Sequence, residues 1–309
     1  MSSYTTTTST ECSSNINIEL TQLRLAMDPS VTILRNFNSI QKSRRLSSGH
    51  LRPVENSKVI GSLPRVKVLT GPLKIPDGSL ELTKWIAMTI MTADHINKYL
   101  FAEALPLAFE VGRIVMPLFV LAFAYNLARP SSNLDASAYL RTARRLAFFG
   151  IISSVPSIKL GGLVDDWYPL NILFTLLVIT TVTGLIEQSR ASKVRIPALL
   201  SALVVFVLGG GLVEFWWPAV GLGVGAWVYF RSGNLLGLFT AAASCASLSW
   251  INGNHWALAA FPTFFILSKF NLEIPRSRWF FYVYYPVHLL ILLLARIPME
   301  RAGYVFWYT

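Results

Sequence analysis

Two ionisable residues, Asp94 and His95, stand inside an apolar stretch, LTKWIAMTIMTADHINKYLF at 82–101. A charge at bilayer depth costs roughly 2.5–3.5 kcal/mol on insertion scales, so such residues usually have a function. Asp94 and Lys98 are spaced i,i+4 and can pair on one helix face. His95 is turned about 100° from Asp94, so we expect it to face the neighbouring helices and to be a candidate general base. The competing interpretation is a helix end that emerges into water with a surface histidine.

Arg113 and His288 are further ionisable residues in apolar segments. In EVGRIVMPLF, Glu110 and Arg113 are spaced i,i+3 and can form a local ion pair. We also expect Arg113 to reach a depth similar to that of His95, where a guanidinium can bind phosphate or carboxylate. His288 lies near the middle of WFFYVYYPVHLLILLL, one turn after Tyr284. These residues predict a polar site inside a helix bundle.

Three polar residues in the middle of the chain are candidates for binding a substrate. Asn171 and Thr175 share a helix face at i,i+4 spacing and can hydrogen-bond either a substrate or another helix. Glu214 precedes two tryptophans at the expected outer surface. We therefore predict Asn171, Thr175 and Glu214 as the substrate-binding set.

A cluster of basic residues, Arg141, Arg144 and Arg145, begins another apolar segment. Such a cluster can contact lipid headgroups, or it can hold the phosphates of a nucleotide cofactor. No metal site is predicted, because the four histidines and two cysteines have no ligating neighbours at short fixed spacing. The net charge of +11 is explained by membrane topology, and no nucleic-acid partner is expected.

The elements that must position these residues are membrane helices. Hydrophobic residues make up 53% and charged residues 14% of the 309 residues, and the mean hydropathy is +0.49, whereas soluble domains carry about 25% charged residues. We predict an all-α transmembrane bundle of about nine spans, with a range of roughly eight to ten. Gly209–Gly211 is expected to break one segment. The spans are 84–103, 108–128, 140–158, 170–188, 196–213, 216–230, 235–251, 255–270 and 279–297.

The placement of lysine and arginine predicts a cytoplasmic N-terminus, because basic residues concentrate in inner loops. The expected outer side has Lys159 and Arg301, with Arg296 at the border, beside Asp165, Asp166 and Glu214. The expected inner loops hold Arg129, Arg141, Arg144, Arg145, Arg190, Lys193, Arg195, Arg231, Lys269, Arg276 and Arg278.

The segment before the first span differs in composition from the rest. Residues 1–83 are rich in Ser, Thr and basic residues, so we predict a disordered cytoplasmic extension that contacts anionic lipid, followed by a membrane domain at 84–309. A later translation start, for example at Met27, and an organellar transit peptide are alternatives. The acidic residues of this segment count against a transit peptide.

Four motifs together resemble the TraX family, the membrane proteins that acetylate conjugative F-type pilin. They are KWIAMTIMTADHIN at 84–97, GRIVMPLFVLAFAYNLAR at 112–129, NILFTL at 171–176 and FYVYYPVHLLIL at 281–292. The resemblance covers about residues 82–297. It is carried over at Asp94, His95, Gly112, Arg113, Asn171 and His288.

The resemblance implies an acetyltransferase in the bacterial inner membrane, with acetyl-CoA as donor and the amino-terminal amine of pilin as acceptor. His95 would be the general base, Arg113 would stabilise an oxyanion or bind a phosphate of the cofactor, and His288 would form part of the pocket wall. Arg141, Arg144 and Arg145 would bind the cofactor diphosphate. The alternatives are acyl transfer to a glycan or other small acceptor, a proton-coupled transporter, and a non-enzymatic scaffold.

Overall fold

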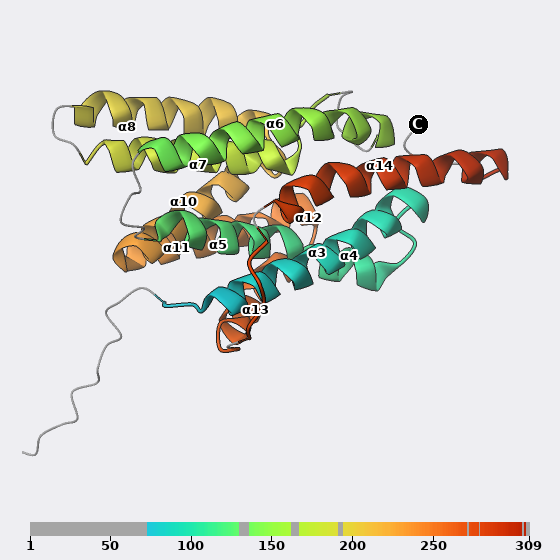
Figure 1. Ribbon diagram of the computed structural model, residues 1–309, viewed down its shortest axis with the longest axis horizontal. Coiled ribbons are helices and arrows are strands. Elements are labelled where there is room, and N and C mark those ends of the chain that lie inside the picture. The colour runs from blue at the N-terminus through green and yellow to red at the C-terminus, as the bar shows by residue number, and fades with distance from the viewer. Residues whose placement is uncertain are drawn as a thin grey trace, which may run out of the picture. The chain divides into compact units, whose positions relative to one another are not determined.

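The computed structural model is helical throughout the part of the chain that it describes (Figure 1). The exception is an isolated parallel bridge between Leu170 and Val213. The predicted all-α class is therefore confirmed for these residues, and the first part of the predicted extension, up to 72, lies outside them. The described residues are 73–129, 136–161, 167–190, 194–270, 272–277, 279–304 and 306.

Each of the nine predicted apolar segments contains helix. The helices are α3 (Asp77–Leu100), α4 (Pro106–Gly112), α5 (Val115–Ala128), α6 (Ala136–Leu160), α7 (Ile172–Gln188), α8 (Arg195–Val204), a π-helical turn (Val205–Gly209), α9 (Gly210–Leu212), α10 (Trp216–Ser232), α11 (Leu235–Ser247), α12 (Ser249–Asn252), a 3₁₀ turn (Trp256–Ala259), α13 (Ala260–Leu267) and α14 (Phe280–Arg301).

Four helical segments of the described chain are long and apolar enough to cross a membrane: Pro106–Ala128, Arg195–Leu212, Leu235–Asn252 and Phe280–Arg301. Large apolar side chains point outward from several helices; Ile151, Val155 and Phe239 are 64%, 66% and 71% exposed. A continuous apolar surface of this kind is unfavourable in water and favourable in contact with lipid tails. The chain is therefore a membrane protein, while the count of nine crossings and the cytoplasmic N-terminus stay predictions.

Helix α3 begins before the predicted domain boundary at Lys84. The polar residues of its first turns have partners: the Ser79 hydroxyl donates to the carbonyl of Phe270, and Lys84 forms an ion pair of 2.6 Å with buried Glu81. At Gly78 an added Cβ would lie 1.5 Å from the carbonyl oxygen of Leu272. Tertiary contacts at Gly78 and Ser79, together with an ion pair within the helix, accompany the helical conformation of these residues, which their polar composition did not indicate.

The second predicted span is two helices, α4 and α5, separated at Arg113 and Ile114. Pro117 explains the break, because it has no N–H to donate to the carbonyl of Arg113 four residues earlier. The amide of Arg113 donates instead to Glu110 (3.2 Å) and that of Ile114 to Val111 (3.1 Å), which tightens the turn. The interruption falls at Arg113, which the sequence predicts as a site residue.

The predicted break at Gly209–Gly211 is absent, because these three residues are helical. These residues continue from the π-helical turn into α9, and the chain leaves the helix only at Val213. An added Cβ at Gly210 would lie 2.6 Å from Cδ1 of Trp217, whose indole N–H donates to the carbonyl of Val207 (3.0 Å). Gly210 and Gly211 therefore provide room for the indole ring of Trp217 while remaining helical.

Helices α10 and α11 cross at glycines on both sides. An added Cβ at Gly225 would lie 2.7 Å from the Ala241 nitrogen, and one at Gly237 would lie 2.7 Å from the Tyr229 nitrogen. Small residues spaced four apart, Gly221 and Gly225 on one helix and Gly237 and Ala241 on the other, bring the backbones together. This contact supports the core that packs behind the polar site.

We expect Gly237→Val to destabilise the protein by about 1–3 kcal/mol, because its side chain meets backbone atoms that cannot move alone. The measurement is thermal unfolding of the purified protein in a fixed detergent. Ala243→Val is the matched control, because it introduces the same side chain at an exposed position of the same helix. An equal loss in both variants would contradict the close crossing.

Helix α14 packs against both α3 and α6 (Figure 1). Near its start, Phe280 lies 4.9 Å from Trp85 of α3 between ring centroids, and nearby Trp279 lies 4.6 Å from the guanidinium of Arg145 on α6. Near its end, Arg296 donates to the carbonyl of Leu160 on α6 (2.8 Å). The helix therefore runs parallel to α6, and its middle faces the second half of α3.

Candidate active site

His95 of α3 and His288 of α14 contact each other directly. Nδ1 of His95 lies 2.8 Å from Nε2 of His288, and the two rings are nearly parallel, at 17° and 5.1 Å between centroids. His288 is only 4% exposed. The two histidines, which the sequence separates by almost the whole membrane domain, therefore form one unit at one depth in the bundle.

The hydrogen bonds define which nitrogens carry protons in the neutral pair. Nδ1 of His288 lies 3.1 Å from the carbonyl of Tyr284, and a carbonyl only accepts, so this Nδ1 bears the hydrogen. Nε2 of neutral His288 is then an acceptor, and Nδ1 of His95 must donate to it. Nε2 of His95 is left with its lone pair. His95 is thus oriented as a proton acceptor, as a general base requires.

A second contact between α3 and α14 lies beside the histidines. The Thr92 hydroxyl donates to the carbonyl of Met88 (2.8 Å), so the Tyr284 hydroxyl is the donor in its 2.6 Å bond to Thr92. The Tyr284 ring also stacks on His288, with centroids 5.1 Å apart and planes inclined by 8°. These contacts fix the orientation of the His288 ring from two directions.

Asp94 packs against Gly112 at the end of α4. A Cβ added at Gly112 would lie 2.4 Å from Cγ and Oδ1 of the Asp94 side chain. Lys98 and Arg113 are electrostatic neighbours of Asp94, and His95 has the same two cations nearby. The turn between α4 and α5 therefore brings the guanidinium near Asp94 and His95 of α3, in agreement with the similar depth predicted from the sequence.

Arg113 does not form the local ion pair that its spacing from Glu110 suggested. Its guanidinium instead lies 3.9 Å from the ring centroid of Phe109. Its Nε is buried and has no hydrogen-bond partner among the described residues. A substrate oxygen would supply the acceptor that this donor lacks.

Glu214 forms one charged group with Asp94, Lys98 and Arg113. Its electrostatic neighbours include Lys98, Arg113 and Asp94, and its carboxylate also accepts from the backbone N–H of Ile172 in the first turn of α7. The Thr175 hydroxyl donates to the backbone carbonyl of Glu214 (3.0 Å). Of the predicted substrate-binding set, Glu214 therefore faces the site, and Thr175 positions it.

Asn171 has a structural position at the start of α7. Its carbonyl oxygen accepts from the amide of Leu173 (3.1 Å) as an N-cap. Its side-chain nitrogen donates to the carbonyl of Gly150 (3.0 Å) and to the Ser154 hydroxyl (3.1 Å). These bonds join α7 to α6 and occupy the amide. The structure thus favours the helix–helix alternative for Asn171.

The arginine cluster lies away from the histidine pair, near the start of α6. Arg141 donates to Ser137 (3.0 Å) and is exposed, as is Arg144, while Arg145 covers Trp279. Trp279 lies nine residues before His288 on or beside α14, a distance of about 14 Å at the helical rise. Exposed guanidinium groups suit a phosphate-bearing ligand, but only a long flexible arm could connect them to the histidines.

The comparisons with known proteins give one finding. The sequence model of the TraX family, described as TraX protein, matches residues 79–296, which is most of the chain. The chain belongs to the TraX family. Neither the curated proteins nor the solved structures contain a match. The matched range runs from the first turn of α3 into the last turns of α14, so it contains every residue of the histidine pair and of the charged group.

The contacts of two polar residues in this TraX chain, Asn97 and Thr92, were not predicted from the sequence. Asn97 is fully buried; its amide donates to the carbonyl of Leu105 (3.0 Å) and its oxygen accepts from the amide of Leu105 (2.9 Å). It closes the turn between α3 and α4, which returns the chain toward Asp94. Thr92 was also overlooked. Both belong to the motif around Asp94 and His95, so their position in it was the available signal.

We expect Gly112→Ala in this TraX chain to lower activity by on the order of tenfold to a hundredfold while leaving the fold intact. The new methyl group displaces the Asp94 carboxylate rather than backbone, and small misplacements at a reacting centre are costly. The measurement is the acetyl transfer that the family resemblance implies, together with thermal unfolding. Gly184→Ala, whose Cβ would approach Tyr139 to 3.2 Å, is the control and should keep activity. Full activity of Gly112→Ala would show that the position of Asp94 against Gly112 does not matter for activity.

Proposed function

We propose that this protein is an integral membrane acetyltransferase that transfers the acetyl group of acetyl-CoA to the amino terminus of pilin. The observation that carries the proposal is the hydrogen bond between His95 and His288, which orients a lone pair of His95 for proton abstraction. Membership of the TraX family supports the reaction and its acceptor. We propose the bacterial inner membrane as its location.

The proposed reaction needs one base and one oxyanion donor. The neutral acceptor amine attacks the thioester carbonyl; the new C–N bond forms, the C–S bond breaks, and the thiolate leaves. His95 Nε2 takes the proton from the amine and returns it to the leaving sulfur. The positive charge that develops on His95 is shared with His288 through their hydrogen bond.

We assign the second requirement, the oxyanion donor, to Arg113. Its guanidinium lies near His95 and Asp94, and its buried Nε lacks an acceptor among the described residues. A donor held beside the base stabilises the charge that develops on the thioester oxygen. Asp94 and Glu214 balance this cation, and a carboxylate here also attracts the amino group of the acceptor.

The arginine cluster supports a phosphate-bearing donor. Arg141 and Arg144 are exposed at the start of α6, and none of the three forms an ion pair with an acid in the part of the chain that the structure describes. We propose that these guanidinium groups hold the phosphates of acetyl-CoA while its acyl end reaches the histidines.

The test is the intact mass of pilin co-expressed with the protein or without it. We expect a gain of one acetyl group, located at the amino terminus by fragmentation, only when the protein is present. An unmodified pilin beside an acetylated glycan extract would move the acceptor to a sugar hydroxyl. No acetylated product of either kind would contradict the proposal.

A proton-coupled transporter is the second candidate, because the same pair of hydrogen-bonded histidines inside a bundle can relay protons. It predicts proton-dependent solute flux in vesicles that contain no acyl donor. The transferase predicts equilibrium binding of acetyl-CoA to the purified protein and no such flux. The two measurements separate the candidates.

A further inference from the structure

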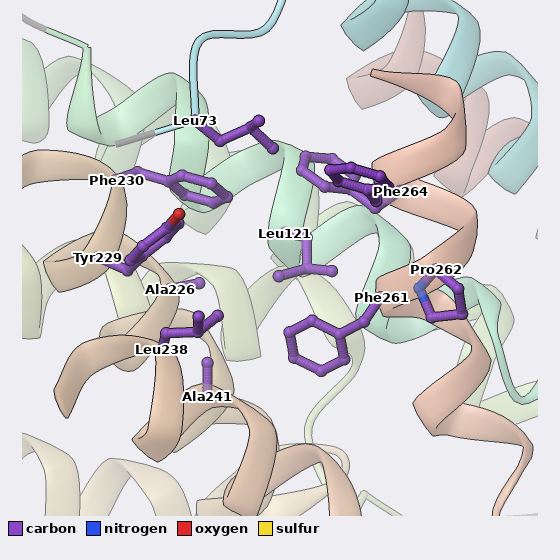
Figure 2. Close-up of a pocket in the computed structure, with 11 residues that line it drawn as sticks. Leu73, Leu121, Ala226, Tyr229, Phe230, Leu238, Ala241, Phe261, Pro262 and Phe264 are labelled. Carbon is purple, nitrogen blue, oxygen red and sulfur yellow. The ribbon is translucent and has the colours of Figure 1, made fainter. Parts of the chain in front are cut away.

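A cavity of about 360 Å³ lies between α5, α10, α11 and α13, on elements other than those that hold the histidine pair (Figure 2). Leu121 of α5 lines it between Tyr229 and Phe230 of α10 on one side and Phe261 and Phe264 of α13 on the other. Its volume is within the range of small-ligand pockets. The Tyr229 hydroxyl is the one polar side-chain group among its lining residues.

The cavity opens between helices whose outer faces are apolar. Phe265 and Ile266 on α13 are 53% and 57% exposed, and Leu235 and Leu236 at the start of α11 are 69% and 68% exposed. In a membrane these faces contact lipid tails. An apolar hollow that is continuous with such a surface takes a hydrocarbon chain rather than a polar metabolite.

Positive charge surrounds one end of the cavity. Nζ of Lys269 lies 4.6 Å from the ring centroid of Phe265, which lines the cavity, and exposed Lys74 directly follows Leu73, another lining residue. Arg129 reaches the same end through Tyr125, whose ring packs on Phe230.

The lysines differ from the neighbouring arginines in their charge balance. Arg129 is paired with Asp77, and Arg231 is paired with Glu187 (2.6 Å). Neither Lys74 nor Lys269 forms an ion pair within the described ranges. Two lysines without acidic partners beside an apolar cavity match a ligand with an anionic head and an apolar tail.

We infer that this cavity binds an anionic phospholipid, with an acyl chain among the aromatic side chains and the phosphate against Lys269 and Lys74. The site is independent of the proposed acyl transfer. It lies at the end of the bundle where α3 begins and α10 and α13 end, which the distribution of basic residues assigns to the cytoplasmic leaflet.

The experiment is native mass spectrometry of the detergent-purified full chain, titrated with phosphatidylglycerol or with phosphatidylcholine of identical acyl chains. We expect a bound phosphatidylglycerol that is retained at higher activation energy than phosphatidylcholine. Lys269→Gln should weaken phosphatidylglycerol binding by about fivefold, as expected for one lysine at a lipid surface, and leave phosphatidylcholine unchanged. Lys159→Gln, at the far end of α6, is the matched control.

Leu238→Trp tests the apolar part of the site, because a larger side chain on α11 fills the cavity. It should lower the binding of both lipids, while Lys269→Gln, an exposed change, keeps the fold in any case. Equal binding of the two lipids, equal effects of Lys269→Gln and Lys159→Gln, or unchanged binding in a folded Leu238→Trp variant would each overturn the inference.

Discussion

Replacing His95 by alanine is expected to remove almost all acetyl transfer, leaving a small residual rate, while the protein still inserts and accumulates. A positioned general base contributes about 10²–10⁴-fold to a rate, and no other imidazole among the described residues presents a free nitrogen to the charged group of Asp94, Arg113 and Glu214. The measurement is the acetylated fraction of co-expressed pilin at matched protein level.

The control for this variant is His255→Ala. His255 is an exposed histidine of the same chain, in the turn before α13, so its removal tests the general cost of losing an imidazole. It should leave acetylation unchanged. Unchanged acetylation in His95→Ala would remove the proposed mechanism, although not the family assignment.

Replacing His288 by alanine is expected to lower the rate by on the order of 10²-fold, and the loss should not add to that of His95→Ala. In the proposed mechanism His288 acts through His95, because it accepts the Nδ1 hydrogen and thereby leaves Nε2 of His95 as the base. Residues that act as a unit show non-additive losses. The measurement is a double-mutant cycle of acetyl transfer rates.

A conservative variant separates positioning from packing. The side-chain oxygen of His288→Gln can still accept the hydrogen of His95, so this variant should recover part of the activity that His288→Ala loses, at equal thermal stability. Losses that multiply in the double mutant would show that the two histidines act independently.

The sequence located the helices well, because apolar runs of this length have few alternatives. A backbone in lipid must satisfy its own hydrogen bonds, so each of the nine apolar segments became helical. The predictions failed where side-chain partners matter. Polar residues 77–83 belong to α3, where the carbonyl of Phe270 accepts from Ser79 and Glu81 pairs with Lys84. Gly210 and Gly211 are helical, with the Trp217 ring packed against them.

Arg113 was predicted in part. The sequence indicated its approximate depth in the membrane and marked the preceding Gly112 as part of the same motif. Its release from Glu110 did not follow, because the break of the helix depends on Pro117 and on where the freed side chain finds an aromatic ring.

The histidine pair separates what the sequence determined from what the tertiary structure determined. Their burial cost in lipid identified His95 and His288 separately from the sequence, and the helical period turned His95 away from Asp94. Only the tertiary structure decided that the two rings meet at 2.8 Å and that Tyr284 orients the second one. The reason is physical: spacing along a helix determines which face a residue occupies, whereas contact between distant helices depends on how side chains of the whole bundle pack.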